Sequence, residues 1–138
     1  MKLHTTNSKN TFIAVADDCP LEMAEVPPRR EGKKSVANYQ FDVLYDHPYE
    51  YTSDDVLFFV YATRNAIPKD KWEKERLKFF SKGQPCFRAS PLTKRYGWGI
   101  HSDNNGKIAI YGIGTKEYAN FIEDASVTKT KAMRSKKA

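Results

Sequence analysis

The chain has 138 residues, of which 40% are hydrophobic, 29% charged and 13% aromatic. This length and composition predict one globular domain and exclude a disordered or collagen-like chain. No apolar run approaches the roughly 20 residues that a membrane-spanning helix needs. The polar start of the chain, residues 1–7, also lacks the apolar core of a signal peptide. We therefore expect a soluble, cytoplasmic protein with no membrane partner.

The net charge of +6 comes mainly from the end of the chain. Five of the 23 Lys and Arg residues lie in residues 127–138, which contain no acidic residue, so the other 18 nearly balance the 17 acidic residues. Such a segment can bind nucleic acid weakly through phosphate contacts, or it can be a frayed, solubilising terminus. We therefore predict a single domain over residues 1–126 and a basic C-terminal tail over residues 127–138.

The first part of the chain predicts two short strands and a capped helix. Strand-forming residues fill positions 11–16 and turn residues follow them, and a second short strand is expected over residues 22–26, before two prolines. The charged, proline-rich segment 27–34 is expected to be an exposed loop. Ser35 can then cap a helix that ends near Tyr45, because apolar residues recur there at helical spacing.

Two further helices are predicted in the middle of the chain. The Thr52 hydroxyl and the Asp55 carboxylate have the spacing of a capping box, which predicts a helix that ends near Arg64. The apolar run within it would also suit a buried strand, and the cap favours the helix. A third helix is expected over residues 69–82, where Gly83 provides a C-terminal stop.

Residues 97–112 predict a β-hairpin whose register follows from its apolar residues. A three-residue loop that ends with Gly106 in the left-handed conformation pairs Ile100 with Ile110. This register places both isoleucines, with Trp98, on one face of the hairpin, whereas a slip of one residue would expose them. The other face then carries Gly97, Gly99, His101, Ala109 and Tyr111.

The last predicted elements are a helix near residues 115–123 and an edge strand over residues 127–133. Taken together, the elements predict the α+β class. We expect a small antiparallel sheet that contains the 97–112 hairpin, with three to four helices packed on one face.

Residues 86–101 concentrate chemically active side chains and contain no acid. Each arginine in this stretch can hold an oxyanion with two parallel hydrogen bonds, and the histidine titrates near neutral pH. The two glycines remove side chains beside the histidine, so a ligand or a packed helix must come close to them. We predict a ligand-binding face formed by Arg88, Arg95, His101, Tyr111, Gly97 and Gly99.

The same residues also have a purely structural explanation. The arginines can pair with acids elsewhere in the fold, and helix packing can account for the glycines. Cys86 and His101 could act as nucleophile and base, but no carboxylate in the stretch would orient the imidazole, and a buried, inert cysteine explains Cys86 better. The Cys and His spacings predict no metal site, and the absence of phosphate-binding glycine motifs predicts no cofactor.

The leading functional prediction is a non-enzymatic or regulatory binding module for an anionic small molecule or an acidic partner segment. The alternative is weak, non-specific nucleic-acid binding through the basic tail with Lys94 and Arg95. The second alternative is a small enzyme that uses Cys86 or His101. The sequence does not specify the oligomeric state.

Four segments of the chain resemble a family of small, mostly bacterial, single-domain proteins of unknown function. They are residues 1–7, 18–20, 51–56 and 87–101, the last of which has the sequence Phe-Arg-Ala-Ser-Pro-Leu-Thr-Lys-Arg-Tyr-Gly-Trp-Gly-Ile-His. The likeness extends over essentially the whole chain and includes residues 131–135. It implies a stand-alone intracellular protein, and it brings no activity, cofactor or catalytic residue. If residues 131–134 belong to the family pattern, the C-terminal tail is docked and not frayed, and the sequence leaves both arrangements open.

Overall fold

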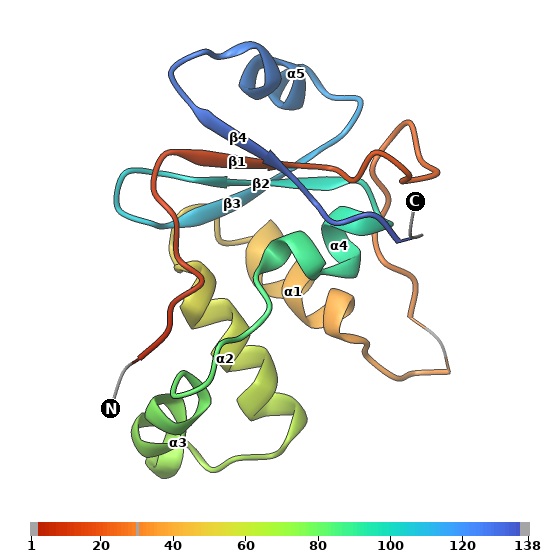
Figure 1. Ribbon diagram of the computed structural model, residues 1–138. Helices are drawn as coiled ribbons and strands as arrows, with labels where there is room; N and C mark the ends of the chain where they lie inside the picture. Colours follow the sequence, from red (N-terminus) through yellow and green to blue (C-terminus); the bar gives the residue numbers. More distant parts are fainter. Residues whose placement is uncertain (1–2, 30, 136–138) are drawn as a thin grey trace.

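The structure, a computed structural model, describes residues 3–29 and 31–135 (Figure 1). No helix within these two ranges is long and apolar enough to cross a membrane. The predicted α+β class is confirmed. In chain order the elements, with η for 3-10 helices, are β1 (Thr11–Ala14), α1 (Val36–Tyr45), α2 (Ser53–Arg64), η1 (Lys69–Lys71), α3 (Trp72–Phe79), η2 (Phe87–Ala89), α4 (Pro91–Lys94), β2 (Trp98–Ser102), β3 (Ile108–Gly112), α5 (Lys116–Glu123) and β4 (Thr128–Lys131).

The four strands form one sheet in the order β3-β2-β1-β4. β2 runs antiparallel to both of its neighbours, whereas β4 runs parallel to β1. The hairpin of β2 and β3 has the predicted register, because Ile100 pairs with Ile110. Gly106 has a φ of 78°, the left-handed conformation that the predicted three-residue loop requires. The rule that keeps the isoleucines on one face therefore selects the correct register.

The two faces of the sheet are covered by different helices (Figure 1). α1, α2 and α4 lie on one side, where their apolar side chains pack with Ile100 and Ile108. α5 lies on the other side, where Tyr118 and Phe121 both contact the ring of Phe12. α5 therefore differs from the prediction that the helices share one face, because its apolar side meets the strand residues that alternate to the opposite surface.

α3 stands away from the sheet and packs on α2 (Figure 1). Phe58 of α2 and Phe80, which follows α3, are buried together, and Trp72 packs against them. The indole Nε1 of Trp72 donates a hydrogen bond to the Ile67 carbonyl at 2.8 Å. This bond ties the start of α3 to the turn after α2, so the two helices project together from the sheet-bearing part of the fold.

Both predicted helix caps are confirmed. Ser35 accepts the backbone N–H of Asn38, whose side chain in turn accepts the backbone N–H of Ser35 at 2.8 Å. Thr52 and Asp55 make the same reciprocal pair at the start of α2, at 3.1 Å and 3.0 Å. Replacing a capping side chain with alanine typically costs about 1 kcal/mol. Local hydrogen bonds thus set where α1 and α2 begin.

Residues 22–26 were expected to form a strand and do not. They run past the ends of β2 and β3 and make isolated hydrogen bonds instead of a ladder. The N–H of Ala24 donates to the Ile113 carbonyl at 3.1 Å, and the N–H of Glu25 donates to the Tyr96 carbonyl at 3.0 Å. A short segment between turn residues and prolines does not form a strand when only a few of its backbone groups can reach a neighbouring strand.

Two helical predictions need adjustment. The helix expected over residues 69–82 begins as η1, and α3 already ends at Phe79. Residues 87–94, where no helix was predicted, form η2 and α4. Ser90 caps α4 through the backbone N–H of Leu92, and a proline occupies the first helical position. Both are ordinary signals for a helix start, and this helix is simply very short.

The C-terminal segment joins the fold as far as it is described. β4 pairs with β1 along its whole length, which confirms the edge strand expected in this region. Ala132 beyond it is buried, and the N–H of Met133 donates to the Arg88 carbonyl at 2.7 Å. Residues 128–132 of the predicted basic tail thus lie in the sheet and the core, while residues 136–138 lie outside the described residues.

Candidate functional site

The two glycines predicted to face a ligand are covered by packed side chains. A Cβ atom at Gly99 would lie 2.4 Å from Cζ of Phe12 and 2.9 Å from Cε2 of Tyr118. A Cβ atom at Gly97 would lie 2.9 Å from Cγ2 of Ile113, and the φ of Gly97 is 81°. Close packing therefore accounts for both glycines, which is one of the two explanations that the sequence allows.

His101 and Tyr111 do come together, and the structure adds Tyr49 to them. The Tyr49 hydroxyl oxygen lies 2.7 Å from Nδ1 of His101 and 2.8 Å from the Tyr111 hydroxyl oxygen. The imidazole of His101 stacks on Phe121 of α5, with ring centroids 4.3 Å apart. We call these four side chains the tyrosine–histidine cluster. It fills the space between the β2–β3 hairpin and α5.

The backbone of Tyr49 is unusual. Its φ of 61° lies in the left-handed region, which residues other than glycine rarely adopt. The N–H of Tyr49 donates to the Ile108 carbonyl at 2.9 Å, and the N–H of Ile108 donates to the Tyr51 carbonyl at 2.9 Å. These two bonds hold the loop after α1 against β3 and offset the strain, so that the Tyr49 ring reaches His101.

Burial keeps Tyr49 and His101 uncharged. Burial, together with the hydrogen bond to Tyr111, raises the pKa of Tyr49 well above its usual value. Burial also lowers the pKa of His101, although the negative charges of Asp103 and Asp124 oppose this change. Both side chains are therefore neutral at neutral pH, which favours packing over the binding of an anion.

The predicted arginines and cysteine lie elsewhere. Arg88 is exposed beside β4, where its Nε donates to the Lys131 carbonyl at 2.7 Å. Arg95 is exposed at the end of α4. Cys86 lines two hollows on the α1–α2 side of the sheet, and no hydrogen bond joins it to His101 in the described part of the chain. The predicted face is thus divided among separate places, and its ligand-binding role stays a prediction.

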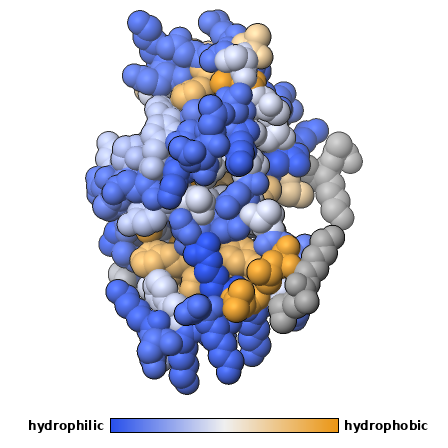
Figure 2. All heavy atoms as spheres, turned by 90° about the vertical axis from the view of Figure 1, so that its left-hand side faces the viewer, coloured by the Kyte–Doolittle hydropathy of each residue, from blue (hydrophilic) through white to orange (hydrophobic). Residues whose placement is uncertain are grey.

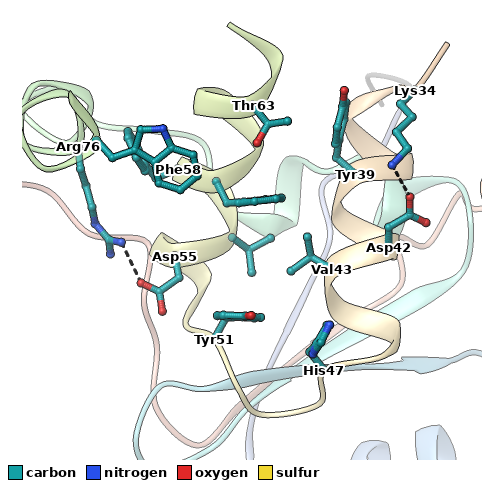
Figure 3. A pocket seen from close by; sticks show the side chains of 13 residues that line it. Lys34, Tyr39, Asp42, Val43, His47, Tyr51, Asp55, Phe58, Thr63 and Arg76 are labelled. Carbon is teal, nitrogen blue, oxygen red and sulfur yellow. Dashed lines mark ion pairs between the residues drawn. The ribbon is translucent and has the colours of Figure 1, made fainter. Parts of the chain in front are cut away.

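A cleft with a volume of about 630 Å³ lies between α1 and α2 and extends to α3 (Figure 3). It exceeds the neighbouring hollows of about 420, 360 and 220 Å³. Figure 3 shows Tyr39 and Val43 of α1 facing Phe58 of α2, with His47 and Tyr51 at one end. We call this space the helix cleft, and its lining residues are Lys34, Tyr39, Asp42, Val43, His47, Tyr51, Asp55, Val56, Phe58, Phe59, Thr63, Trp72 and Arg76.

Aromatic rings form much of the wall of the helix cleft. Tyr51 is 38% exposed and Phe59 is 36% exposed, and the partly buried rings of Tyr39 and Trp72 line the same space. The four residues of the tyrosine–histidine cluster do not line it. Each ring offers an apolar face on which a planar ligand can stack, and stacking would remove that face from water.

The charged side chains around the helix cleft are paired with one another. Nζ of Lys34 lies 3.0 Å from Oδ2 of Asp42, and Nη1 of Arg76 lies 2.9 Å from Oδ1 of Asp55 (dashed lines in Figure 3). Desolvation alone would raise the pKa of Asp55, but the hydrogen bond from the Thr52 N–H and the Arg76 guanidinium together lower this pKa. Asp55 is therefore ionised at neutral pH and its pair is intact.

Arg76 also borders a second apolar groove, of about 420 Å³, in which Leu3 and Leu77 are both about half exposed.

Figure 2 shows the side of the molecule that lies on the left of Figure 1. Hydrophobic side chains form a band there at the height of α2, with hydrophilic side chains across it. Part of the apolar surface on this side thus lies at the height of α2.

Residues 3–138 match a family of unknown function, DUF6157. The chain belongs to this family. The predicted membership of an uncharacterised family is therefore confirmed. No curated protein matches the DUF6157 chain, and no solved structure matches it. The function has to be inferred from the geometry of this DUF6157 protein itself.

The helical spacing of the apolar residues before Tyr45 predicts an inward face that includes Tyr39 and Val43, and Trp72 lies on the helix predicted over residues 69–82. Tyr39, Val43 and Trp72 do lie on inner surfaces of this DUF6157 protein. The spacing of residues on one helix does not show whether the facing helix packs against it or leaves a cleft. The sequence signal for the cleft was the number of aromatic rings on these helix faces. Among the described residues, no group of three or more His, Cys, Asp or Glu could hold a metal ion.

Proposed function

We propose that this protein is a binding module for a small, uncharged, ring-containing molecule, which it holds in the helix cleft. The observation that carries the proposal is the cleft of about 630 Å³ with its aromatic walls. Pockets for small molecules typically span about 300 to 1,000 Å³ and are mostly apolar, with a few polar groups that orient the ligand.

The pairing of charges indicates an uncharged ligand. Lys34 and Arg76 already face carboxylates, and Nδ1 of His47 lies 2.6 Å from the Glu50 carboxylate. An ionic ligand would have to compete with one of these pairs, whereas an uncharged ring can enter without disturbing them. This proposal therefore departs from the anionic ligand that the sequence favours, and that earlier expectation stays a prediction for Arg88 and Arg95.

Two hydroxyl groups can orient a ligand. Tyr51 and Thr63 both line the helix cleft. Within residues 3–29 and 31–135, neither hydroxyl has a hydrogen-bond partner. In Figure 3, Thr63 lies toward one end of the cleft and Tyr51 toward the other. A ring system with a polar atom at either end would satisfy both the apolar walls and these hydroxyls.

The test uses Nile red, an uncharged fused-ring dye whose fluorescence rises in apolar surroundings. Thr63→Trp places a large side chain in the helix cleft, and Asn120→Trp places the same side chain on exposed α5 as a matched control. We expect saturable binding of one dye per chain, weakened at least about tenfold by Thr63→Trp and unchanged by Asn120→Trp. Circular dichroism verifies that both variants fold.

Equal affinity in the two variants would overturn the proposal, and so would a dye signal that never saturates. The anionic dye anilinonaphthalene sulfonate is tested in parallel, to compare an anionic ligand with the uncharged Nile red. Preferential binding of this sulfonate, with loss on Arg88→Met or Arg95→Met, would instead support the anionic ligand expected from the sequence.

A further inference from the structure

A second hollow, of about 360 Å³, lies on the other side of α2 from the helix cleft. It is enclosed by α1, α2 and the segment that leads through η2 into α4. We call it the Gln40 hollow, after the buried amide that faces it. Its lining residues are Val36, Gln40, Leu57, Val60, Tyr61, Arg64, Asn65, Phe79, Gln84, Pro85, Cys86, Ala89, Ser90 and Pro91.

The orientation of the Gln40 amide follows from its neighbour. The Ser90 hydroxyl oxygen accepts the N–H of Leu92 at 3.1 Å, as the cap of α4. The hydroxyl proton of Ser90 is therefore free to donate, and it donates to Oε1 of Gln40. The carbonyl end of the amide is thus satisfied by Ser90, and the NH2 end points away from it.

The NH2 group of Gln40 has no hydrogen-bond partner among the described residues. The residue is only 2% exposed, and within residues 3–29 and 31–135 no acceptor bonds its Nε2. No fully enclosed side-chain N or O atom of the described residues lacks a partner, so Nε2 opens on the hollow that its side chain lines. This N–H donor on a largely buried side chain can therefore donate to an acceptor atom that enters the hollow.

The charge of the Gln40 hollow differs from that of the helix cleft. Arg64 is its single charged lining residue, and no acid lines it. Arg64 is exposed, and in the described part of the chain it forms no ion pair. The remaining walls are largely apolar, with Leu57, Val60 and Phe79 among them. A ligand that enters the hollow can therefore contact the unpaired Arg64 guanidinium, the N–H donor of Gln40 and the apolar walls.

We propose that the Gln40 hollow is a second binding site, for a small monocarboxylate with a short hydrocarbon chain or one ring. One carboxylate oxygen accepts the N–H of Gln40, the negative charge pairs with Arg64, and the hydrocarbon part lies on the apolar walls. The donor-only character of both groups selects against amines. The site is independent of the helix cleft, because the two share no lining residue.

The test is an NMR titration with benzoate, in which the side-chain NH2 signal of Gln40 reports directly on the hollow. Gln40→Met identifies this signal by its disappearance. We expect benzoate to move the signal saturably, whereas benzylamine, which has the same ring and a positive charge, leaves it in place. Arg64→Met should weaken benzoate at least about fivefold. Arg95→Met, an exposed arginine outside the hollow, is the matched control and should leave the affinity unchanged.

Three outcomes would overturn the proposal. The first is an unmoved Gln40 signal with acetate, butyrate and benzoate alike, in which case the amide holds only water. The second is equal benzoate affinity in the Arg64→Met protein. The third is a loss caused by Arg95→Met instead of Arg64→Met, which would place the carboxylate at the arginine expected from the sequence. The unaltered protein and Arg64→Met decide the matter even if Gln40→Met does not fold.

Discussion

The two sides of the sheet differ in packing, because the α5 side is filled by side chains whereas the α1–α2 side contains open hollows. On the α5 side, the Tyr49 hydroxyl forms hydrogen bonds with both His101 and Tyr111, and Phe12 and Tyr118 fill the space above Gly99. On the α1–α2 side, helices meet helices and leave the helix cleft and the Gln40 hollow open. The comparison teaches that chemically active residues gathered in a sequence can complete a core, while binding space forms where helices diverge.

The largest expected effect comes from a substitution that tests how closely side chains pack on the α5 side. Gly99→Val places new atoms within contact distance of Phe12 and Tyr118. We expect a loss of about 3 kcal/mol in the free energy of unfolding, because a packed core tolerates extra methyl groups poorly. Urea unfolding measures it. Thr63→Trp, which adds a larger side chain to the open helix cleft, should change the same quantity by less than about 0.5 kcal/mol. Similar losses in both variants would remove the contrast between the two sides.

A smaller effect is expected from the hydroxyl at the centre of the tyrosine–histidine cluster. Tyr49→Phe removes the bonds to His101 and Tyr111 and should lower the free energy of unfolding by about 1 kcal/mol. Tyr45→Phe is the control, since Tyr45 is 58% exposed. Thermal unfolding compares the two variants. A Tyr49→Phe protein as stable as the Tyr45→Phe protein would show that the cluster is held by ring packing alone.

The smallest expected effect is a pH dependence on the α5 side. Burial lowers the pKa of His101 in the folded chain, although the negative charges of Asp103 and Asp124 raise it in part. The unfolded chain therefore binds more protons below about pH 6.5, and stability should fall as the pH drops from about 7.5 to 5. The measurement is the free energy of unfolding at each pH. His101→Gln should flatten this fall. His4 and His47 are present in both proteins, so an unchanged slope would mean that His101 contributes nothing.

Features set by neighbouring residues were predictable from the sequence. The caps at Ser35 and Thr52 depend on hydrogen bonds within one helical turn. The register of the hairpin depends on keeping Ile100 and Ile110 on one face. Each of these follows from rules that act over a few residues, and each matches the structure.

Features that join distant segments were not predictable. The parallel pairing of β4 with β1 brings together residues more than a hundred positions apart, as Thr11 and Thr128 show. The partner of His101 also came from afar, because Tyr49 reaches it only through a left-handed backbone conformation in the loop after α1. Nothing in the local pattern around His101 indicates that a tyrosine would occupy its open side.

The candidate sites were missed for a related reason. Gln40 lies on a predicted helix, but its free N–H depends on Ser90, fifty residues later, which takes up the carbonyl end of the amide. The helix cleft depends on how α1 and α2 separate, and the pattern of either helix alone does not contain that information. Hollows are properties of pairs of surfaces, whereas sequence motifs describe one surface at a time.

The strand order has a consequence for synthesis on the ribosome. β1 emerges first, but its neighbours on both sides are β2 and β4, so its hydrogen-bonding edges stay open until Trp98–Ser102 and then Thr128–Lys131 have been translated. An open strand edge can pair with another nascent chain. The edge of β1 is therefore exposed until Thr128–Lys131 has been made, and pairing with β4 then closes this edge to other chains.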